Sequence, residues 1–415
     1  MTDVRPAAVT IDDLAAPQFP AQAMPIRQAM AEMGAGVVLE SEALMEAGVE
    51  QAGVDDFGEP GFRDRLDIVC SALQTDVPLS AAGRAAAFVQ LSGLLRNRLL
   101  VQDVLNRHPE VDALEVAAPI VICGLPRTGT THLHNLISAD PSMRSLPYWE
   151  SEQPVVPAGA LDDRIANTTA ALDVVNTAMP YFKRMHEMTT DHVHEEINLL
   201  AMDISSMYFE TMAPMPTWRD YYRSTDQTPA YQYLKQVLKV LQFLRGGTRW
   251  VLKSPQHLEQ FGPLSTVFPD ATFVVTHRDP VSVTASLTTM MAYLARLNLE
   301  PVDPASVARY WADRLETMLR ACVEDRDLLP ASQSIDVRFT EFMADDVAMV
   351  ERIYDVAGQP FTADVRAAMD AFMADHPRGR HGGIRYDLAA LGIDVEERRA
   401  ALQFYVDRFG IESER

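Results

Sequence analysis

The segment that decides the fold is residues 118–137, which read APIVICGLPRTGTTHLHNLI. A short β-branched run leads into a turn bounded by Gly124 and Gly129, and the apolar residues that follow recur at helical spacing. In such a strand–loop–helix unit, glycines let backbone N–H groups converge on a phosphate, and the helix N-terminus adds a partial positive charge. The segment therefore predicts a phosphate-binding loop. The alternative is a plain strand-to-helix turn without a ligand.

The loop departs at one position from the motif of nucleoside triphosphatases. Its two glycines and the pair Thr130-Thr131 fit G-x-x-x-x-G-K-[ST], except that Thr130 stands where that motif has lysine. The lysine reaches the β- and γ-phosphates of ATP or GTP. Hydrolysis of a nucleoside triphosphate is therefore not expected, although Arg127 inside the loop still predicts an anionic ligand.

Composition limits the class of protein. The chain has 415 residues, enough for one large domain with an insertion or for two domains. Its net charge of −22 makes nucleic acid an unexpected partner, because a duplex-binding surface needs clustered Lys and Arg. The three cysteines are scattered and predict no disulfide framework, which fits a reducing cytosol. We find no secretory signal and no apolar run of about 20 residues, so we expect a cytoplasmic protein without a membrane span.

The order of elements predicts an α/β protein, a P-loop type parallel sheet flanked by helices, with an N-terminal helical extension. Methionines and aromatic residues concentrate between Tyr181 and Tyr222, where they either line a pocket for an apolar acceptor or pack in the core. We expect these segments: a flexible tail (1–30), the helical extension (31–117), the main domain (118–390) with a helical acceptor-pocket insertion (about 150–245), and a C-terminal helix (391–415).

Three cations are expected at one edge of the sheet. Lys253 and Arg278 each follow a predicted strand, as Arg127 does, and ligands of parallel sheets sit at the carboxyl ends of the strands. A basic, glycine-rich segment, 376–386, stands out in this acidic chain. It is expected either to close over a ligand or to be a solvated loop.

Together these motifs resemble the bacterial sulfotransferases that use 3′-phosphoadenosine 5′-phosphosulfate (PAPS). The resemblance spans most of the chain, and its most specific parts are GLPRTGTT at 124–131, WVLKSP at 250–255 and HRDP at 277–280, continuing to Ser286. By this resemblance Arg278 and Ser286 would bind the 3′-phosphate, and Lys253 would bridge cofactor and acceptor. The loop would cradle the 5′-phosphosulfate through Pro126, Arg127, Thr128, Gly129, Thr130 and Thr131. The later basic segment would close on the nucleotide through Arg378, Gly379 and Arg380.

The catalytic base is open at the level of sequence. The resemblance suggests Glu195 or Glu196 as the base, and His192, His194 and His257 are the further candidates. The pair His192-x-His194 also fits a metal, but alternate residues suit a strand better than a closed tetrahedral site, so no metal site is expected. An exposed acidic helix start is the structural alternative for the glutamates. His132 takes the place of a tryptophan common in the family, which leaves the adenine-stacking residue open.

The resemblance implies an enzyme that moves a sulfuryl group in line from PAPS to a hydroxyl of a small-molecule acceptor, releasing adenosine 3′,5′-bisphosphate. Because a sulfuryl group carries fewer charges than a phosphoryl group, Arg127 and Lys253 can stabilise its transfer without a metal ion. A P-loop kinase or nucleoside triphosphatase and a non-catalytic nucleotide-binding protein are the alternatives. The oligomeric state is open, a homo-oligomer included.

Overall fold

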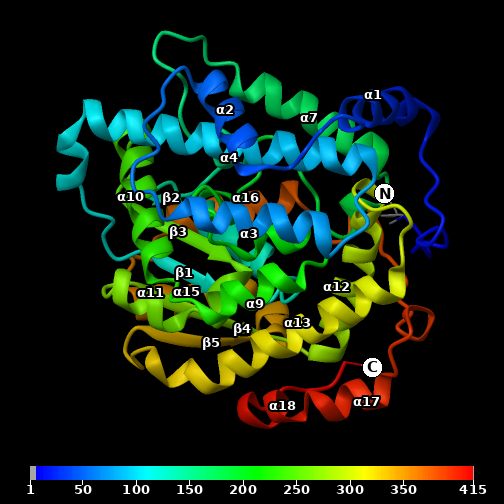
Figure 1. Ribbon diagram of the computed structural model, residues 1–415. Coiled ribbons are helices and arrows are strands. Elements are labelled where there is room, and N and C mark those ends of the chain that lie inside the picture. Colours follow the sequence, from blue (N-terminus) through cyan, green and yellow to red (C-terminus); the bar gives the residue numbers. More distant parts are fainter. Residues whose placement is uncertain (1–5, 415) are drawn as a thin grey trace.

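A five-stranded parallel sheet lies at the centre of the molecule (Figure 1). The computed structural model describes residues 6–414. The strands follow the order β2-β3-β1-β4-β5 across the sheet, and all neighbouring pairs are parallel. This confirms the predicted α/β fold. The strands are β1 (Ile120–Cys123), β2 (Met143–Arg144), β3 (Arg249–Ser254), β4 (Thr272–His277) and β5 (Ser334–Arg338).

Helices cover both faces of the sheet, so its central strands are continuous apolar runs. In β1, Ile120 and Ile122 pack on one face with α5, α15 and α16, while Val121 and Cys123 pack on the other with α10 to α13. The β-branched residues that predicted these strands are thus buried on alternating sides. The helices of the main domain are α5 (Thr130–Ser138), α10 (Thr228–Arg245), α11 (Phe261–Val267), α12 (Pro280–Leu294), α13 (Pro304–Asp325), α14 (Phe339–Ala344), α15 (Asp346–Ala357) and α16 (Ala363–Asp375).

Four helices precede the sheet. They are α1 (Met24–Gly34), α2 (Ser41–Ala52), α3 (Phe62–Thr75) and α4 (Ala81–Arg107). The longest, α4, crosses the upper part of the molecule in Figure 1, with α2 beside it. It begins at Ser80, whose hydroxyl accepts a hydrogen bond from the Gly83 N–H at 2.9 Å, so one of the free amides of its first turn is satisfied.

The first thirty residues differ from the flexible tail expected for them. From residue 6 onward this segment packs on the main domain. The Val9 N–H donates to the Gly383 carbonyl at 3.1 Å, and Asp13 forms an ion pair with buried Arg296 at 2.7 Å. The sequence suggested a tail because the segment has no strong periodicity. Its partners lie far along the chain, where local patterns give no information. The first five residues of the predicted tail lie outside the described residues.

The C-terminal segment also differs from expectation. It is not one helix but two short ones, α17 (Val395–Ala401) and α18 (Gln403–Phe409), separated at Leu402. A short helix, α6 (Tyr148–Glu152), follows β2. The helices between α6 and α10 are α7 (Arg164–Ala178), α8 (Ile197–Ala201) and α9 (Pro216–Ser224).

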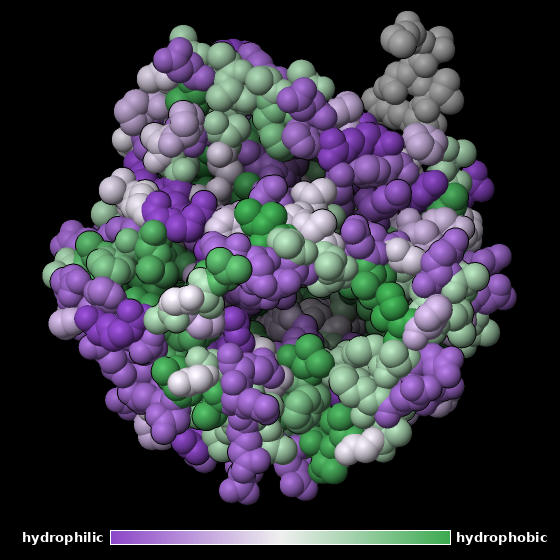
Figure 2. Space-filling view, turned by 90° about the horizontal axis from the view of Figure 1, so that it is seen from above, coloured by the Kyte–Doolittle hydropathy of each residue, from purple (hydrophilic) through white to green (hydrophobic). Residues whose placement is uncertain are grey.

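Figure 2 shows a face on which hydrophilic residues are interspersed with apolar ones, and a hollow near its centre that is partly bordered by apolar residues. None of the helices within residues 6–414 is long and apolar enough to cross a membrane.

Candidate functional site

The register of the sheet brings the predicted cations to one edge. Cys123, the last residue of β1, lies beside Ser254, the last residue of β3, and beside Val275 of β4, which continues to His277. The loops that follow these strands therefore emerge side by side. This is the edge at which ligands of parallel α/β sheets bind.

The loop after β1 has the backbone of a phosphate cradle. A Cβ on Gly124 would lie 1.9 Å from the Thr276 hydroxyl, and Gly129 has φ +87°, so both positions require glycine. Arg127 also adopts a positive φ, +73°, which is unusual for a residue with a side chain. No side chain caps α5, so the amides of its first turn, Thr130 and Thr131 among them, are available to a ligand.

Arg127 and Arg278 are tied to each other through this loop. Arg127 Nε donates to the Ser286 hydroxyl at 2.8 Å, and a second guanidinium nitrogen donates to the Met185 carbonyl. Arg278, which follows β4, donates to the Arg127 carbonyl at 2.7 Å and lies 4.0 Å above the Phe339 ring. Ser286 is buried and lines none of the cavities described below. It therefore contacts the site through Arg127.

A cavity of about 500 Å³ opens beside the loop, and we call it the basic cavity. Gly129, Thr130 and Thr131 line it, together with Gly379 of the glycine-rich segment. Thr128, by contrast, is buried and donates to the Leu125 carbonyl at 2.7 Å. The lining includes six cationic side chains and one carboxylate, Glu187. The cations are Arg127, Lys183, Arg184, Arg278, Arg378 and Arg380.

Carboxylates hold three of these arginines. Arg278 forms a two-pronged ion pair with Glu414 near the C-terminus, at 2.6 and 2.7 Å. Arg378 pairs with Asp346, and Arg380 pairs with Glu187 at 2.6 Å. The segment 376–382 therefore lies over the basic cavity rather than in open solvent. An anionic ligand of this cavity would compete with these carboxylates for the arginines.

Lys253 stands at the inner end of the site. Its side chain is buried, and its ammonium group forms an ion pair with Glu195. Glu195 in turn lines a second cavity, whereas Lys253 itself lines neither cavity in the described structure. The Lys253 ammonium is thus connected to this second cavity through its ion pair with Glu195.

Glu196 has a different surrounding from its neighbour. It is 1 % exposed, accepts a hydrogen bond from the Lys253 N–H at 2.9 Å and pairs with His257. Burial acts to raise the pKa of Glu196, but the charge of His257 and the hydrogen bonds that Glu196 accepts outweigh it, so the pKa is lowered. His257 also contacts the Tyr231 hydroxyl at 2.8 Å. Glu196 therefore fixes the backbone beneath Lys253 and does not face a cavity.

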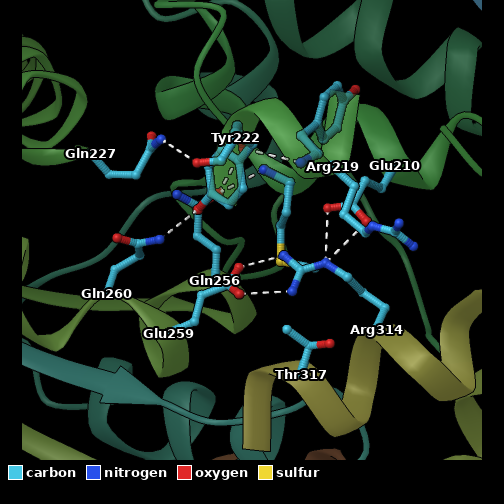
Figure 3. A network of polar contacts seen from close by, with 12 residues as sticks. Glu210, Arg219, Tyr222, Gln227, Gln256, Glu259, Gln260, Arg314 and Thr317 are labelled. Carbon is cyan, nitrogen blue, oxygen red and sulfur yellow. Dashed lines mark hydrogen bonds and ion pairs between the residues drawn. The ribbon is translucent and has the colours of Figure 1, made fainter. Parts of the chain in front are cut away.

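A buried ionic network holds the segment after Lys253. Arg314 of α13 is fully buried between Glu259 and Glu210, with contacts of 2.7 Å and 3.0 Å (Figure 3). Glu259 ends the 3-10 helix Pro255–Glu259 that follows β3. Removing one partner from such a group leaves a charge buried without compensation. The network thus anchors the segment that follows Lys253 to α13.

The second cavity, of about 260 Å³, is the methionine-lined cavity. Its apolar wall contains Met188, Met207 and, from α12, Leu287, Met290 and Met291. Pro126, Glu195 and Asn198 also line it, and it shares Arg127, Thr130 and Thr131 with the basic cavity. The methionine-rich stretch thus lines a cavity with some of its residues and packs in the core with others. Other members, Met185, Met202, Met212 and Met215, are buried in the core clusters.

Two residues around this cavity were not predicted from the sequence. Glu152 is buried in its wall with Tyr148, and burial raises the pKa of Glu152 to about 7, although hydrogen bonds from Tyr148 and Asn198 oppose the shift. His186 joins the pair His192 and His194, and the potential ligand atoms of the three residues all lie within 4.8 Å of one another. The sequence singled out the pair but not His186.

The sequence model of the Sulfotransferase family matches residues 119–363 of this chain. The match covers the phosphate loop, the strand bearing Lys253 and the helix bearing Ser286. The chain therefore belongs to the sulfotransferase family and is a sulfotransferase enzyme.

Solved structures agree with this assignment. Sulfotransferase STF1 from Mycobacterium tuberculosis is 27 % identical, with a TM-score of 0.77, over 88 % of this chain and 98 % of that one. Sulfotransferase STF9 from Mycobacterium avium is 26 % identical, with a TM-score of 0.82, over 91 % of this chain and 99 % of that one. A search of curated protein sequences gave no significant match.

Proposed function

We propose that this sulfotransferase transfers the sulfuryl group of PAPS to a hydroxyl of an apolar or amphipathic small molecule. The observation that carries the proposal is the basic cavity: six cationic side chains gather beside an uncapped helix N-terminus in a chain of net charge −22. So local a concentration of positive charge matches a ligand with several anionic groups.

The residues present fit PAPS. Gly124 and Gly129 leave the loop without side chains where a phosphate approaches, and a Cβ on Gly124 would not fit. The volume of about 500 Å³ lies in the range of cofactor sites. Arg278 would hold the 3′-phosphate, and Ser286, eight residues later, would act through its hydrogen bond with Arg127. Arg378 and Arg380 would close over it.

PAPS, when bound, would supply the sulfuryl group and adenosine 3′,5′-bisphosphate as the leaving group. Lys253 and Arg127 would stabilise the negative charge of the transferring group and of the leaving phosphate. As the sulfuryl group passes from the phosphate to the acceptor oxygen, Glu195 would accept the proton of the acceptor hydroxyl. Glu196 is a positioning residue, since it bonds to the Lys253 backbone. No magnesium ion on the phosphates is needed for this charge balance.

The acceptor would lie in the methionine-lined cavity. This cavity shares Arg127 and two threonines of the loop with the basic cavity, so a hydroxyl in it approaches the loop. Its flexible methionines suit an apolar body, and the carboxylate of Glu195 lies at its polar side. A phenol or a lipid-like alcohol meets both requirements.

The proposal is tested by incubating the protein with PAPS and a panel of phenols, sterols and aliphatic alcohols. Mass spectrometry should detect a sulfate ester formed in equal amount to adenosine 3′,5′-bisphosphate, and Lys253→Ala should slow the formation of both. A protein that binds the bisphosphate but sulfates none of the panel would contradict the proposed acceptor class. A protein that transfers phosphate from ATP instead would favour a kinase.

A further inference from the structure

We propose that His186, His192 and His194 form a binding site for one divalent transition-metal ion of the zinc type, with a fourth coordination position open to the methionine-lined cavity. Binding of a metal ion at this site does not depend on the proposed function. A role of the bound ion in orienting an acceptor oxygen would rest on that function. The metal site departs from the sequence-based expectation that no metal is bound.

The geometry of the three rings is the first argument. His192 Nε2 and His194 Nδ1 are 3.0 Å apart, and the potential ligand atoms of all three residues lie within 4.8 Å of one another. Nitrogen ligands of a tetrahedral zinc ion, at about 2.0–2.1 Å from the metal, are about 3.3 Å from each other. Closing the cluster around an ion therefore requires a movement of no more than about 1.5 Å, which a side chain can make.

The second argument is that the rings are oriented for ligation. His192 Nδ1 faces the Thr189 backbone, at 2.5 Å from the carbonyl oxygen and 3.1 Å from the N–H, so Nε2 is the ring nitrogen that faces His194. Such a backbone carbonyl partner is typical of metal-binding histidines. Neither ring nitrogen of His186 has a hydrogen-bond partner among the described residues. Tyr148 packs against the other two rings, with centroid distances of 5.2 Å to His192 and 4.7 Å to His194.

The charged groups around the cluster are of both signs. Lys253 and Arg127 lie close enough to act on His186, and both would repel a cation. Glu195 forms an ion pair with Lys253, and Glu187 acts on His192 with the opposite sign.

An open position follows from the placement of the cluster. His186 and His194 line the methionine-lined cavity, and they are the only histidines of the described residues that do so. Three protein ligands plus one exchangeable position is the arrangement of catalytic zinc sites. A donor set made only of imidazoles favours zinc, cobalt, nickel or copper over magnesium or calcium.

The test is direct metal binding to chelator-treated protein, without cofactor or acceptor. We expect Co²⁺ to bind in one equivalent with the visible absorption of a tetrahedral site, and Zn²⁺ to displace it. His192→Ala and His186→Ala should each weaken Co²⁺ binding at least about 100-fold, whereas the remote His108→Ala should not. Using two variants guards against misfolding of one of them, which thermal unfolding without metal would reveal.

Equal Co²⁺ binding in the wild type and both variants, or none in the wild type, would overturn the site. Azide is the probe of the fourth position. A change in the Co²⁺ spectrum on adding azide supports an open position, and an unchanged spectrum overturns that part. Binding of adenosine 3′,5′-bisphosphate to the same samples is measured separately, so failure of the metal site and failure of the proposed function are distinguished.

Discussion

The two cavities of the site meet at Arg127, Thr130 and Thr131 but are built on different physical principles. The basic cavity is lined by cations, and carboxylates hold several of them. The methionine-lined cavity combines flexible apolar side chains with a few buried polar groups. The basic cavity is defined by charged residues in motifs of fixed spacing. The methionine-lined cavity is defined by the packing of flexible side chains. The difference suggests a constant ligand on one side and an acceptor specified by shape on the other.

The largest effect is expected at Lys253, whose partner Glu195 lines the methionine-lined cavity. Lys253→Ala should lower kcat by about 10²–10³-fold, because a charge that stabilises the transferring group is lost. The affinity for adenosine 3′,5′-bisphosphate should hardly change, as measured by calorimetry. Lys239→Ala is the control, since its ammonium only donates to the Asp112 carbonyl. A Lys253→Ala variant as active as the wild type would contradict a role of Lys253 in the transfer.

The second effect belongs to the methionine-lined cavity alone. The pKa of Glu152 is raised by burial from 4.5 to about 7, so its carboxyl group holds the proton more tightly in the folded than in the unfolded chain. Stability is therefore lost as the pH rises from about 4.5 through about 7, by about 3 kcal/mol in total. Glu152→Gln should remove this loss in denaturant unfolding measured from pH 5 to 8.

The exposed Glu50→Gln is the matched control and should leave the pH dependence as it is in the wild type. If Glu152→Gln shows the same pH dependence as the wild type, the carboxyl group of Glu152 is not held neutral by the cavity.

The third effect belongs to the basic cavity alone. Arg278→Ala should weaken binding of adenosine 3′,5′-bisphosphate by about 10–100-fold, because charge-assisted hydrogen bonds to the phosphate are lost. Calorimetry should show this, while an acceptor found in the panel should keep its KM. Arg352→Ala removes an equal charge outside both cavities and should have no effect. A change in acceptor KM alone would reverse the assignment of the cavities.

The smallest effect concerns the carboxylate that holds Arg278. Glu414→Gln should tighten bisphosphate binding by about 2–5-fold, since the partly exposed ion pair that a phosphate must displace contributes little stability. Glu412→Gln changes the same tail without touching Arg278 and should have no effect. Weaker binding in Glu414→Gln would show instead that the carboxylate orients the guanidinium.

The sequence predicted the elements around the basic cavity better than those around the methionine-lined cavity. The glycine spacing around Arg127 and the apolar runs before Lys253 and Arg278 are local signals, and the structure places these loops at one edge of the sheet. By contrast, the pairing of Arg278 with Glu414 joins residues far apart in sequence. No periodicity reports such contacts.

Around the methionine-lined cavity, too, the sequence did not predict which side chains face the cavity. Glu195 and Glu196 are adjacent in sequence, yet one lines a cavity and the other is buried against the Lys253 backbone. The distinction depends on how the chain enters α8. Similarly, His186 joins the His192 and His194 pair only because residues 186–194 fold back on themselves. Tertiary packing decides both arrangements, and the local sequence does not.

The central claim is that the basic cavity binds adenosine 3′,5′-bisphosphate rather than a nucleoside triphosphate. A thermal-shift comparison of this bisphosphate with ADP and ATP, each with and without Mg²⁺, tests it most directly, because a ligand that binds only the folded chain raises its melting temperature. We predict the largest shift for the bisphosphate, independent of Mg²⁺ and reduced in Arg278→Ala. A larger shift with ATP and Mg²⁺ would contradict the account.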